Sequence, residues 1–485
     1  MQRIILVVLL TLLVNGALAP RVMAAETPAP RPNIIFIMAD DLGFGELGCY
    51  GQQRIHTPRI DELARQGTKF TQAYAGGCVC TPSRSCLMTG THGGHTPARD
   101  NVPHYRTYLQ DDDVTVAEVL STAGYRCGGV GKWSLGDAGT VGRATNQGFD
   151  TWFGYLNQDH AHYYYTEYLD DDEGRLSLAG NTQTRAHYSH DLLVERALEF
   201  IRASKDGPFF LYAAFTVPHF GSASEDATRL PVPSDAPYSD EPWDQQAKNY
   251  AAMITRLDGD VGRIADLVDS LGLAENTLII VTSDHGPWHG MPKLFDSAGP
   301  FRGEKRDVYE GGIRVPFVAR WPGHVPAGAT NDAVFAFWDM MPTFAELAGA
   351  QTPDDIDGIS VVEALRGGEL AAPHDYLYWD YGHNRETYHQ AVRMDDWKGV
   401  RHGRRSHRTV RSQPRRGRDD EPRRFTTGRG SPDRADHARR SRRRPLRGRQ
   451  AIHGQRPFGH PTLANAGLAV RPIGNATRHH RARRA

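Results

Sequence analysis

The sequence is poor in cysteine, and its one long N-terminal apolar run is too short to cross a membrane comfortably. Five cysteines occur in 485 residues. In an oxidising compartment, an odd count indicates that one cysteine is not paired in a disulfide and has another role. The run from Ile4 to Val14 spans about a dozen residues, whereas a transmembrane helix needs about 20. The sequence also lacks a net charge, because 57 Lys and Arg balance 57 Asp and Glu.

The N-terminus has the pattern of an export signal rather than an anchor. Arg3 precedes the apolar run, and Val22-Met23-Ala24 fits the small-x-small cleavage rule. We therefore predict a signal peptide over 1–24, a Pro-rich linker over 25–32, and release into the periplasm or the exterior. No transmembrane anchor should remain after cleavage. A retained anchor or a lipidated form is the alternative, but no cysteine lies near the cleavage site.

The neutral total hides two kinds of sequence. From Arg401 to the end there are 25 arginines, no lysine and five acidic residues, whereas the first 400 residues hold 32 basic and 52 acidic ones. A segment like 401–485 is typical of a disordered tail or of a basic tail that binds polyanions. A shifted reading frame in GC-rich DNA also produces such an Arg-rich sequence, and we favour a frameshift or another error at the C-terminus as the explanation. We expect no specific nucleic-acid binding from the acidic body of the chain.

Three continuous apolar runs predict buried parallel strands. They cover Asn33 to Met38, Pro208 to Phe215 and Leu278 to Thr282. Amphipathic helical patterns lie between them, as in Asp191 to Ser204 and Gln246 to Leu271. This alternation predicts a doubly wound α/β domain over 33–372. Tyr376 to Trp379 and Ala391 to Val400 predict strands of a smaller domain, which begins within 373–400.

Polar residues directly follow two of these strands. Asp40 and Asp41 come after the first run, and Asp284 and His285 after the third. Open α/β sheets bind ligands at the carboxyl ends of their strands. Carboxylate oxygens at that place suit Ca²⁺ or Mg²⁺. A lone Asp-Asp pair is more often a helix cap or a turn, but the second pair makes a metal site the better interpretation.

The stretch from Cys80 to Gly90 carries the most specific signal. Cys80-Thr81-Pro82-Ser83-Arg84 is followed by Leu87, Thr89 and Gly90. Alone, Cys80 could be a structural cysteine or a thiol nucleophile beside an arginine. The whole stretch, however, resembles the signature of the sulfatase family. That resemblance implies that a maturation enzyme oxidises Cys80 to formylglycine, whose hydrated aldehyde attacks the sulfur of a sulfate ester.

The resemblance extends over about 31–400 and implies both the fold and the metal. The fold would be alkaline-phosphatase-like, with a mostly parallel central sheet flanked by helices and a smaller C-terminal α+β subdomain. The family usually holds Ca²⁺, and Mg²⁺ is the alternative here. The implied ligands are Asp40, Asp41, Asp284 and His285, together with residue 80. The family commonly has Asn where this chain has His285, so the departure is mild.

Further family motifs imply the other catalytic residues. Lys132 lies in Gly-Lys-Trp-Ser-Leu-Gly, and Lys305 precedes Arg-Asp-Val-Tyr-Glu-Gly-Gly. Each ammonium would bind a sulfate oxygen, while Arg84 would hold the hydrated aldehyde. His219 follows Thr-Val-Pro and matches the general acid of the family. Taken singly, each of these residues is more often a surface lysine or a core histidine.

Ser134 is the main departure from the family pattern. The family has histidine there, and serine cannot act as a base near neutral pH. Either the release of sulfate is slow, or another group substitutes. His160 and His162 are the candidates, and we predict that one of them lines the substrate pocket; a metal site, a carbohydrate platform or a polar loop is the alternative.

The sequence therefore predicts an exported sulfatase that acts on an aryl sulfate or a sulfated carbohydrate. A phosphatase or phosphodiesterase of the same superfamily, or an impaired chain whose basic tail binds polyanions, remains as an alternative. The aromatic residues from Trp152 to Tyr165 are expected either to stack on a sugar ring or to pack in the core.

Overall fold

The computed structural model describes residues 31–403, apart from 173, 223–224, 289–292, 383–384 and 386–387, together with the backbone of 406–411. The expected signal peptide and most of the expected linker and tail lie outside the described residues. None of the described helices has the length and apolar character that a membrane crossing requires.

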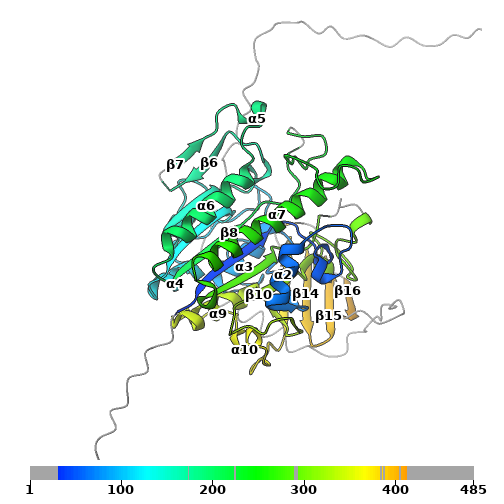
Figure 1. Cartoon of the computed structure of the whole chain (residues 1–485). Coiled ribbons are helices and arrows are strands. Elements are labelled where there is room, and N and C mark those ends of the chain that lie inside the picture. The colour runs from blue at the N-terminus through cyan, green and yellow to red at the C-terminus, as the bar shows by residue number, and fades with distance from the viewer. Residues whose placement is uncertain are drawn as a thin grey trace, which may run out of the picture.

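A ten-stranded mixed sheet forms the centre of the molecule (Figure 1), in the order β11-β2-β10-β9-β1-β8-β4-β5-β6-β7. The strands of this sheet are β1 Asn33–Ala39, β2 Thr68–Phe70, β4 Arg126–Lys132, β5 Thr151–Tyr155, β6 Tyr168–Asp171, β7 Gly174–Ser177, β8 Phe209–Ala214, β9 Thr277–Ser283, β10 Phe317–Arg320 and β11 Ala329–Asn331. The strands from β9 to β5 pair in parallel, whereas β10, β6 and β7 pair with their neighbours in antiparallel fashion. The predicted fold class is confirmed, with antiparallel strands added toward both edges.

Helices cover both faces of this sheet. They are α2 Pro58–Gln66, α3 Cys80–Thr89, α4 Val116–Thr122, α5 Asn181–Thr184, α6 Ser189–Ser204, α7 Gln245–Ser270, α8 Glu310–Ile313, α9 Met340–Ala348 and α10 Val362–Leu365. In Figure 1, α6 and α7 run across the face nearer the viewer. Together with α2 they form one core layer with the sheet, while α3, α4 and α9 contribute to the other.

Strand β1 shows why its sequence is apolar throughout. Ile35 and Ile37 enter the layer under α6 and α7, whereas Ile34, Phe36 and Met38 enter the opposite layer. Side chains alternate between the two faces of a strand, so a strand covered on both faces must be apolar at every position. The same burial fixes the carboxyl end of β1 in the middle of the sheet, where the next residues are Asp40 and Asp41.

A second, antiparallel sheet follows the large domain. It contains β13 Leu377–Tyr381, β14 His389–Met394, β15 Trp397–His402 and β16 Ser406–Arg411, and a short pair joins β3 Ala73–Tyr74 to β12 Phe335–Ala336. The segment predicted as one strand over Ala391 to Val400 is thus two strands joined by a tight turn. The sheet continues to Arg411, so its last strand lies inside the segment predicted to be the tail.

Candidate active site

The carboxylates of the site come from two neighbouring strands. Ala39 of β1 pairs with Ser283 of β9, so Asp40 and Asp284 follow directly from paired residues. The Asp284 amide donates to the Ala39 carbonyl at 3.0 Å. Asp41 has a φ of 72°, a left-handed conformation that its amide stabilises by donating to Asp284 Oδ1 at 3.2 Å. The three carboxylates therefore converge at the position that the sequence predicted.

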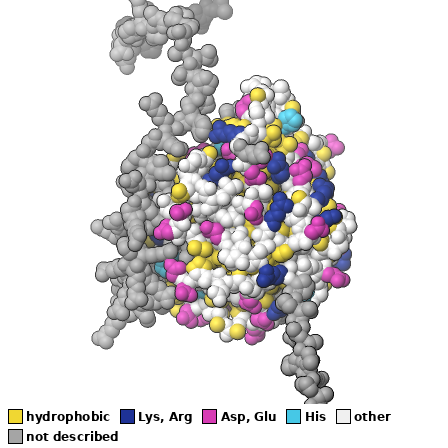
Figure 2. Space-filling view, turned by 90° about the vertical axis from the view of Figure 1, so that its left-hand side faces the viewer, with side chains coloured by type: hydrophobic (Ala, Val, Ile, Leu, Met, Phe, Trp, Pro, Cys, Tyr) yellow, Lys and Arg dark blue, Asp and Glu magenta, His cyan; other side chains and the backbone are white. Residues whose placement is uncertain are grey.

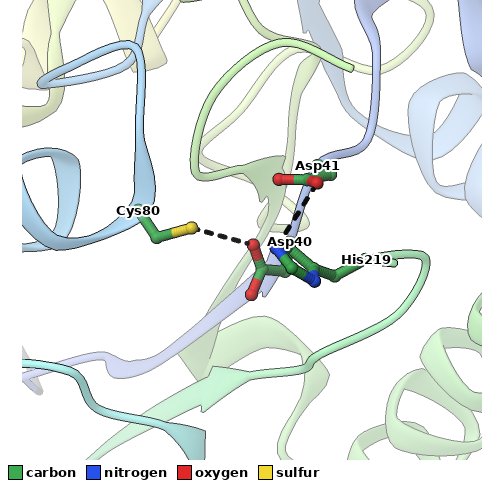
Figure 3. A group of neighbouring side chains, drawn as sticks. All are labelled: Asp40, Asp41, Cys80 and His219. Atoms are coloured by element: carbon green, nitrogen blue, oxygen red, sulfur yellow. Dashed lines mark hydrogen bonds and ion pairs between the residues drawn. The ribbon is translucent and has the colours of Figure 1, made fainter. Parts of the chain in front are cut away.

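Cys80 is the first residue of α3, and its thiol points into this group (Figure 3). Its Sγ lies 3.3 Å from Asp40 Oδ1 and 3.3 Å from His285 Nε2. Burial and the Asp40 carboxylate raise the pKa of Cys80. The positive charges of Lys132 and Lys305 outweigh both, so the pKa lies well below its ordinary value.

Two buried lysines contact the carboxylates. Lys132, the last residue of β4, donates to Asp40 Oδ2 at 2.6 Å. Lys305 donates to Asp41 Oδ1 at 2.5 Å, and its ammonium is 3.7 Å from the sulfur of Cys80. Both lysines are buried, at 0% and 4% exposure. Buried ammonium groups persist where carboxylates compensate their charge, which is the arrangement here.

Arg84 contacts the carboxylates rather than the side chain of residue 80. It lies one turn along α3 from Cys80, and its Nη2 is 2.9 Å from Asp284 Oδ2 and 3.4 Å from Asp40 Oδ2. Its Nη1 donates to the Lys132 carbonyl at 2.5 Å. The direct effect of this guanidinium is to orient two of the carboxylates.

Two glycines let these segments approach each other. A Cβ on Gly131, next to Lys132, would lie 1.9 Å from the Ala214 carbonyl oxygen of β8. A Cβ on Gly286, next to His285, would lie 1.9 Å from the Gly311 carbonyl oxygen. Any other residue at either place would push the end of β8 or helix α8 away from the site.

His219 lies next to Asp40 and Asp41 (Figure 3), and its Nε2 is 3.6 Å from Asp41 Oδ2. Its Nε2 is also 3.0 Å from Lys305 Nζ, and its Nδ1 is 2.7 Å from the Phe220 carbonyl. The carbonyl can only accept, so the ring proton is on Nδ1 and Nε2 accepts from the ammonium. Burial, together with the charge of Lys305, holds the pKa of His219 well below its ordinary value.

His162 lies against His219, whereas His160 does not. The rings of His162 and His219 stack with centroids 4.7 Å apart and planes 4° apart. His162 Nε2 is buried and has no hydrogen-bond partner. His160 also has a buried nitrogen without a partner, Nδ1, but its Nε2 pairs with Thr166 Oγ1 at 2.7 Å and its ring packs on Tyr168 rather than on His219. Of the two predicted candidates, only His162 is thus brought to the site.

Ser134 pairs with Gln158, a residue that was not among the predicted site residues. Its Oγ donates to Gln158 Oε1 at 2.7 Å, and Thr81 Oγ1 lies 3.5 Å from the same atom. Ser134 has a φ of 67° and is buried at 1% exposure. Gln158 therefore links the Ser134 loop to the first turn of α3. Its only sequence signal was its position two residues before His160.

The side chains around Asp40 have the ligand chemistry of a metal site. Asp40, Cys80, Asp284 and His285 offer ligand atoms within 4.8 Å of one another, and Asp41 belongs to an overlapping group. The buried Asp41 Oδ2 accepts no hydrogen bond. Three carboxylates fit a hard divalent cation, while the imidazole of His285 is a donor that Ca²⁺ takes less often. The group thus fits a divalent metal without fixing which one.

The pKa values of the ligand group reflect the cost of burying it. Burial raises the pKa of Asp41 to about 7 and that of Asp284 to about 6. For His285, burial lowers the pKa, but the Asp284 carboxylate outweighs it and raises the value to about 9. Perturbed values of this kind cluster at functional sites.

A further group of candidate ligands is better explained as a loop anchor. His92, His95 and Asp357 bring ligand atoms within 4.8 Å. The Gly94 amide, however, donates to His92 Nδ1 at 3.0 Å, so the ring proton is on Nε2, the atom that faces Asp357. His95 Nδ1 binds the same carboxylate at 2.8 Å. These contacts fasten the loop after α3 to residue 357.

Most of the aromatic residues from Trp152 to Tyr165 belong to the core. Trp152, Phe153, Tyr155, Tyr164 and Tyr165 are all buried at 5% exposure or less. The core-packing alternative is therefore confirmed for them. All five cysteines are free thiols, so no disulfide joins them in this structure.

The comparisons with known proteins agree with this geometry. The family model "Sulfatase" matches residues 32–350, and the C-terminal model of N-sulphoglucosamine sulphohydrolase matches 301–409. Arylsulfatase G of Rattus norvegicus is 33% identical over 454 residues, which cover 81% of this chain and 80% of the relative. N-acetylgalactosamine-6-sulfatase of Canis lupus familiaris is 33% identical over 72% of this chain and 68% of its own length.

A solved structure is similar over much of the chain as well. The crystal structure of Ps i-CgsB in complex with k-i-k-neocarrahexaose superposes with a TM-score of 0.69 and 28% sequence identity. The match covers 78% of this chain and 86% of that one.

Proposed function

The chain belongs to the sulfatase family and is a sulfuric ester hydrolase, and we propose that it is an exported enzyme whose substrate is a sulfated carbohydrate or an aryl sulfate. The names of the relatives above support both substrate classes. The observation that carries the proposal is the position of Cys80. Its sulfur lies against Asp40 and His285, with the ammonium of Lys305 at 3.7 Å.

Under this proposal a maturation enzyme converts Cys80 to formylglycine before the chain folds. Cys80 is fully buried, so a modifying enzyme needs an unfolded or nascent chain. The hydrated aldehyde supplies a hydroxyl that attacks sulfur and a second hydroxyl that later expels sulfate. The surrounding cations, which already lower the pKa of the thiol, favour any anion that forms at residue 80.

Asp40, Asp41, Asp284 and His285 would hold a divalent metal, Ca²⁺ or Mg²⁺, beside residue 80. Its chemical contribution would be to polarise the sulfate oxygens. The open Asp41 Oδ2 and the three converging carboxylates support this assignment. Arg84 orients Asp284 and Asp40 for it through the contacts at 2.9 and 3.4 Å.

Two lysines and a histidine would assist the reaction itself. Lys132 and Lys305 would balance the negative charge of the sulfate oxygens, and His219 would supply the proton for the leaving group. The two buried ammonium groups contact the carboxylates of Asp40 and Asp41 beside residue 80, and each can balance charge that grows in the transition state. His219 would protonate the departing alcohol oxygen. In the described state its Nε2 accepts from Lys305, so the proton must come from or through that ammonium. A bound sulfate raises the pKa of His219 by adding negative charge, which favours this transfer.

His162 would substitute for the histidine that the family has at position 134. Its ring is stacked on His219, and its buried Nε2 is open to a substrate or product group. Ser134 is held by Gln158 and has no basic atom to offer. In this proposal Ser134 shapes the pocket wall, and His160 supports the loop from behind.

Two measurements test the proposal. Mass spectrometry of the peptide that contains residue 80 should show an aldehyde in place of the thiol. The protein should release sulfate from 4-nitrophenyl sulfate much faster than it releases phosphate from 4-nitrophenyl phosphate. A phosphate rate equal to or above the sulfate rate would instead assign the site to a phosphatase or phosphodiesterase of the same superfamily.

A serine variant adds a mechanistic test. Cys80→Ser keeps one hydroxyl but lacks the second one, so it should retain the sulfuryl group covalently on residue 80. Intact-mass measurement after incubation with 4-nitrophenyl sulfate should show this adduct, with no second turnover. Steady multiple turnover by Cys80→Ser would rule out the proposed use of residue 80.

Export is the remaining element of the proposal. The expected signal peptide over 1–24 lies outside the described residues, so the support is its sequence pattern alone. N-terminal sequencing of the secreted or periplasmic protein should begin near Ala25. Recovery of the full-length chain in the cytoplasm or in the membrane fraction would contradict export with cleavage.

A further inference from the structure

The loop before α8 places two neighbouring cations in opposite environments. Lys305 is buried and contacts Asp41, whereas Arg306 is exposed. The backbone is fixed between two segments of the site, because the Lys305 amide donates to the Pro287 carbonyl at 2.8 Å and the Arg306 amide donates to the Cys78 carbonyl at 2.9 Å. Arg306 adopts a φ of 77°, which is uncommon for a residue with a side chain. The fold therefore holds Arg306 at a defined place although the conformation is costly.

Trp288 joins this arginine to the proposed proton donor. Its indole is half-buried and stacks on Phe220 with centroids 5.9 Å apart. The ring of His219 lies 6.5 Å from it. Lys305 Nζ and Arg306 Cζ each lie 5.1 Å from the centroid of the same indole. The two cations are therefore no further apart than the sum of these two distances, and contact with an indole favours both.

The charge of Arg306 has no carboxylate partner among the described residues. Its acidic neighbours in the chain are Glu304 and Asp307, and neither forms an ion pair with it there; Asp307 Oδ2 instead accepts from the Glu304 amide at 3.2 Å. Arg385 provides a contrast near the same region. Its guanidinium donates to both oxygens of Asp100 and to the Tyr381 hydroxyl, so its charge is already compensated.

One face of the described chain has no broad area of positive charge (Figure 2). On the face of the described chain that Figure 2 shows, basic and acidic side chains are interspersed rather than collected into an area of one sign. An anionic substrate would thus be oriented by individual cations near the site and not by a broad field over this face.

We propose that Arg306, supported by Trp288, binds a second anionic group of the substrate. The inference rests on the proposed function and narrows it: the preferred substrate is a sulfated oligosaccharide that carries another sulfate or a carboxylate close to the scissile ester. The planar guanidinium matches two oxygens of either group. The span between Lys305 and Arg306 accommodates two anionic groups on one disaccharide, whereas 4-nitrophenyl sulfate has only one.

The experiment compares substrates across matched variants. Sulfate release is measured from 4-nitrophenyl sulfate and from hexosamine–uronate disaccharides with one sulfate, with two sulfates, and with one sulfate and a reduced carboxyl group. Arg306→Gln should lower kcat/KM for the preferred dianionic disaccharide about tenfold relative to 4-nitrophenyl sulfate, mainly through KM. Arg306→Lys, which keeps the charge but lacks the fork, should lose less. The disulfated and carboxyl-reduced substrates show which second anion is recognised.

Arg302→Gln is the control, because Arg302 is an exposed arginine of the same loop that lies 4.1 Å from the Tyr309 ring. It should leave the substrate ratio unchanged. An unchanged ratio in Arg306→Gln, or an equal fall in both variants, would overturn the proposal.

A binding measurement separates this inference from the proposed function. Cys80→Ala cannot turn over, so calorimetry with the dianionic disaccharide reports binding alone. The double variant Cys80→Ala and Arg306→Gln should bind the disaccharide about tenfold more weakly than Cys80→Ala alone. An unchanged affinity would overturn the proposed subsite. If the wild type carries the aldehyde at residue 80 but releases sulfate from no substrate, the proposed function fails, whatever the binding result.

Discussion

Glu310 and Asp41 are both buried carboxylates that bind a lysine, but their surroundings differ. Both oxygens of Glu310 are used: Oε1 accepts from Lys398 at 2.8 Å, and Oε2 accepts from Tyr74 at 2.6 Å and Arg314 at 3.3 Å. Burial raises the pKa of Glu310, but Lys398 and Arg314 outweigh it and leave the value below normal. Asp41 uses one oxygen for Lys305 and leaves the other without a hydrogen bond.

The two carboxylates also connect different parts of the fold. Glu310 begins α8 in the large domain, while Lys398 belongs to β15 of the small sheet. Arg393 of β14 reinforces this contact by donating to the Tyr74 hydroxyl at 2.5 Å and to Gln72 Oε1 at 2.7 Å. These polar groups hold the C-terminal sheet against α8 and the β3 segment of the large domain. The Asp41 group instead brings together residues that follow neighbouring strands of a single sheet.

The difference shows how a buried charge can be assigned a role. Buried polar atoms are nearly always hydrogen-bonded, so a carboxylate with all acceptors satisfied by the protein has a structural explanation. A carboxylate with an open acceptor and a raised pKa has a binding site as its better explanation. Asp41, whose pKa burial raises to about 7, is of the second kind. The two groups should therefore respond differently to substitution.

The largest predicted effect is a loss of turnover without a loss of stability. Cys80→Ala removes the proposed nucleophile precursor but leaves Asp40 and His285 in place. Sulfate release from 4-nitrophenyl sulfate should fall by about four orders of magnitude or more. The thermal midpoint should stay close to that of the wild type, as measured by calorimetry. A large fall in the thermal midpoint of Cys80→Ala would contradict this prediction, because residue 80 would then be needed for stability as well as for turnover.

The converse effect is predicted for Lys398→Met. Glu310 then keeps its charge without its principal partner, and the free energy of unfolding should fall by about 3 kcal/mol. Urea unfolding measures this change, and kcat per folded molecule should be retained. Glu310→Gln combined with Lys398→Met should recover part of the loss because no unpaired charge remains. Lys248→Met is the control. Lys248 donates an exposed hydrogen bond to the Ser239 carbonyl, and removing it should lower the free energy of unfolding by less than about 0.5 kcal/mol.

A smaller effect should follow from adding metal to chelator-treated protein. Divalent cation at about 100 times its dissociation constant should stabilise the wild type by about 2.7 kcal/mol. Calorimetry with CaCl₂ and with MgCl₂ measures the shift and distinguishes the two ions. Lys398→Met should keep the shift, whereas Asp41→Asn should lose most of it. An equal shift in Asp41→Asn would mean that the open oxygen is not a ligand.

The sequence was sufficient to predict the residues that follow directly from strand ends. Each of β1, β8 and β9 is apolar on both faces, so its limits are visible, and the next residues must meet at one edge of the sheet. Asp40, Asp284 and His285 were predicted in this way. Lys132 and Cys80 needed the flanking family motifs, since a single lysine or cysteine carries little information. Strand β7 at the sheet edge and its neighbour β6 were not predicted; β7 is exposed along its length and lacks an apolar pattern.

Contacts between loops could not be predicted from the chain. The pairing of Ser134 with Gln158 joins two turns, and no periodicity relates one to the other. Trp288 and Arg306 were not selected either. Trp288 follows the Asp-His-Gly motif closely and Arg306 follows Lys305 directly, but adjacency does not reveal which way a loop side chain points. The left-handed φ of Arg306 is a property of the fold alone.

The smallest predicted effect separates the two histidines that the sequence could not distinguish. His160–His162 forms a short 3₁₀ helix, in which residues two apart are rotated by about 240°, so their side chains point about 120° apart around the axis. They therefore cannot both face the site, and the stacked pair with His219 selects His162. His162→Asn should lower kcat for 4-nitrophenyl sulfate by about tenfold or more.

His160→Asn is the matched variant and should act on stability instead. It removes the contact with Thr166 and should cost about 1 kcal/mol of folding free energy while kcat stays near the wild-type value. If both variants kept kcat and kcat/KM intact, neither histidine would replace the one missing at Ser134. The unpartnered Nε2 of His162 would then have only a packing role. An open hydrogen-bonding atom would not by itself be enough to distinguish a binding site from a structural group such as Glu310.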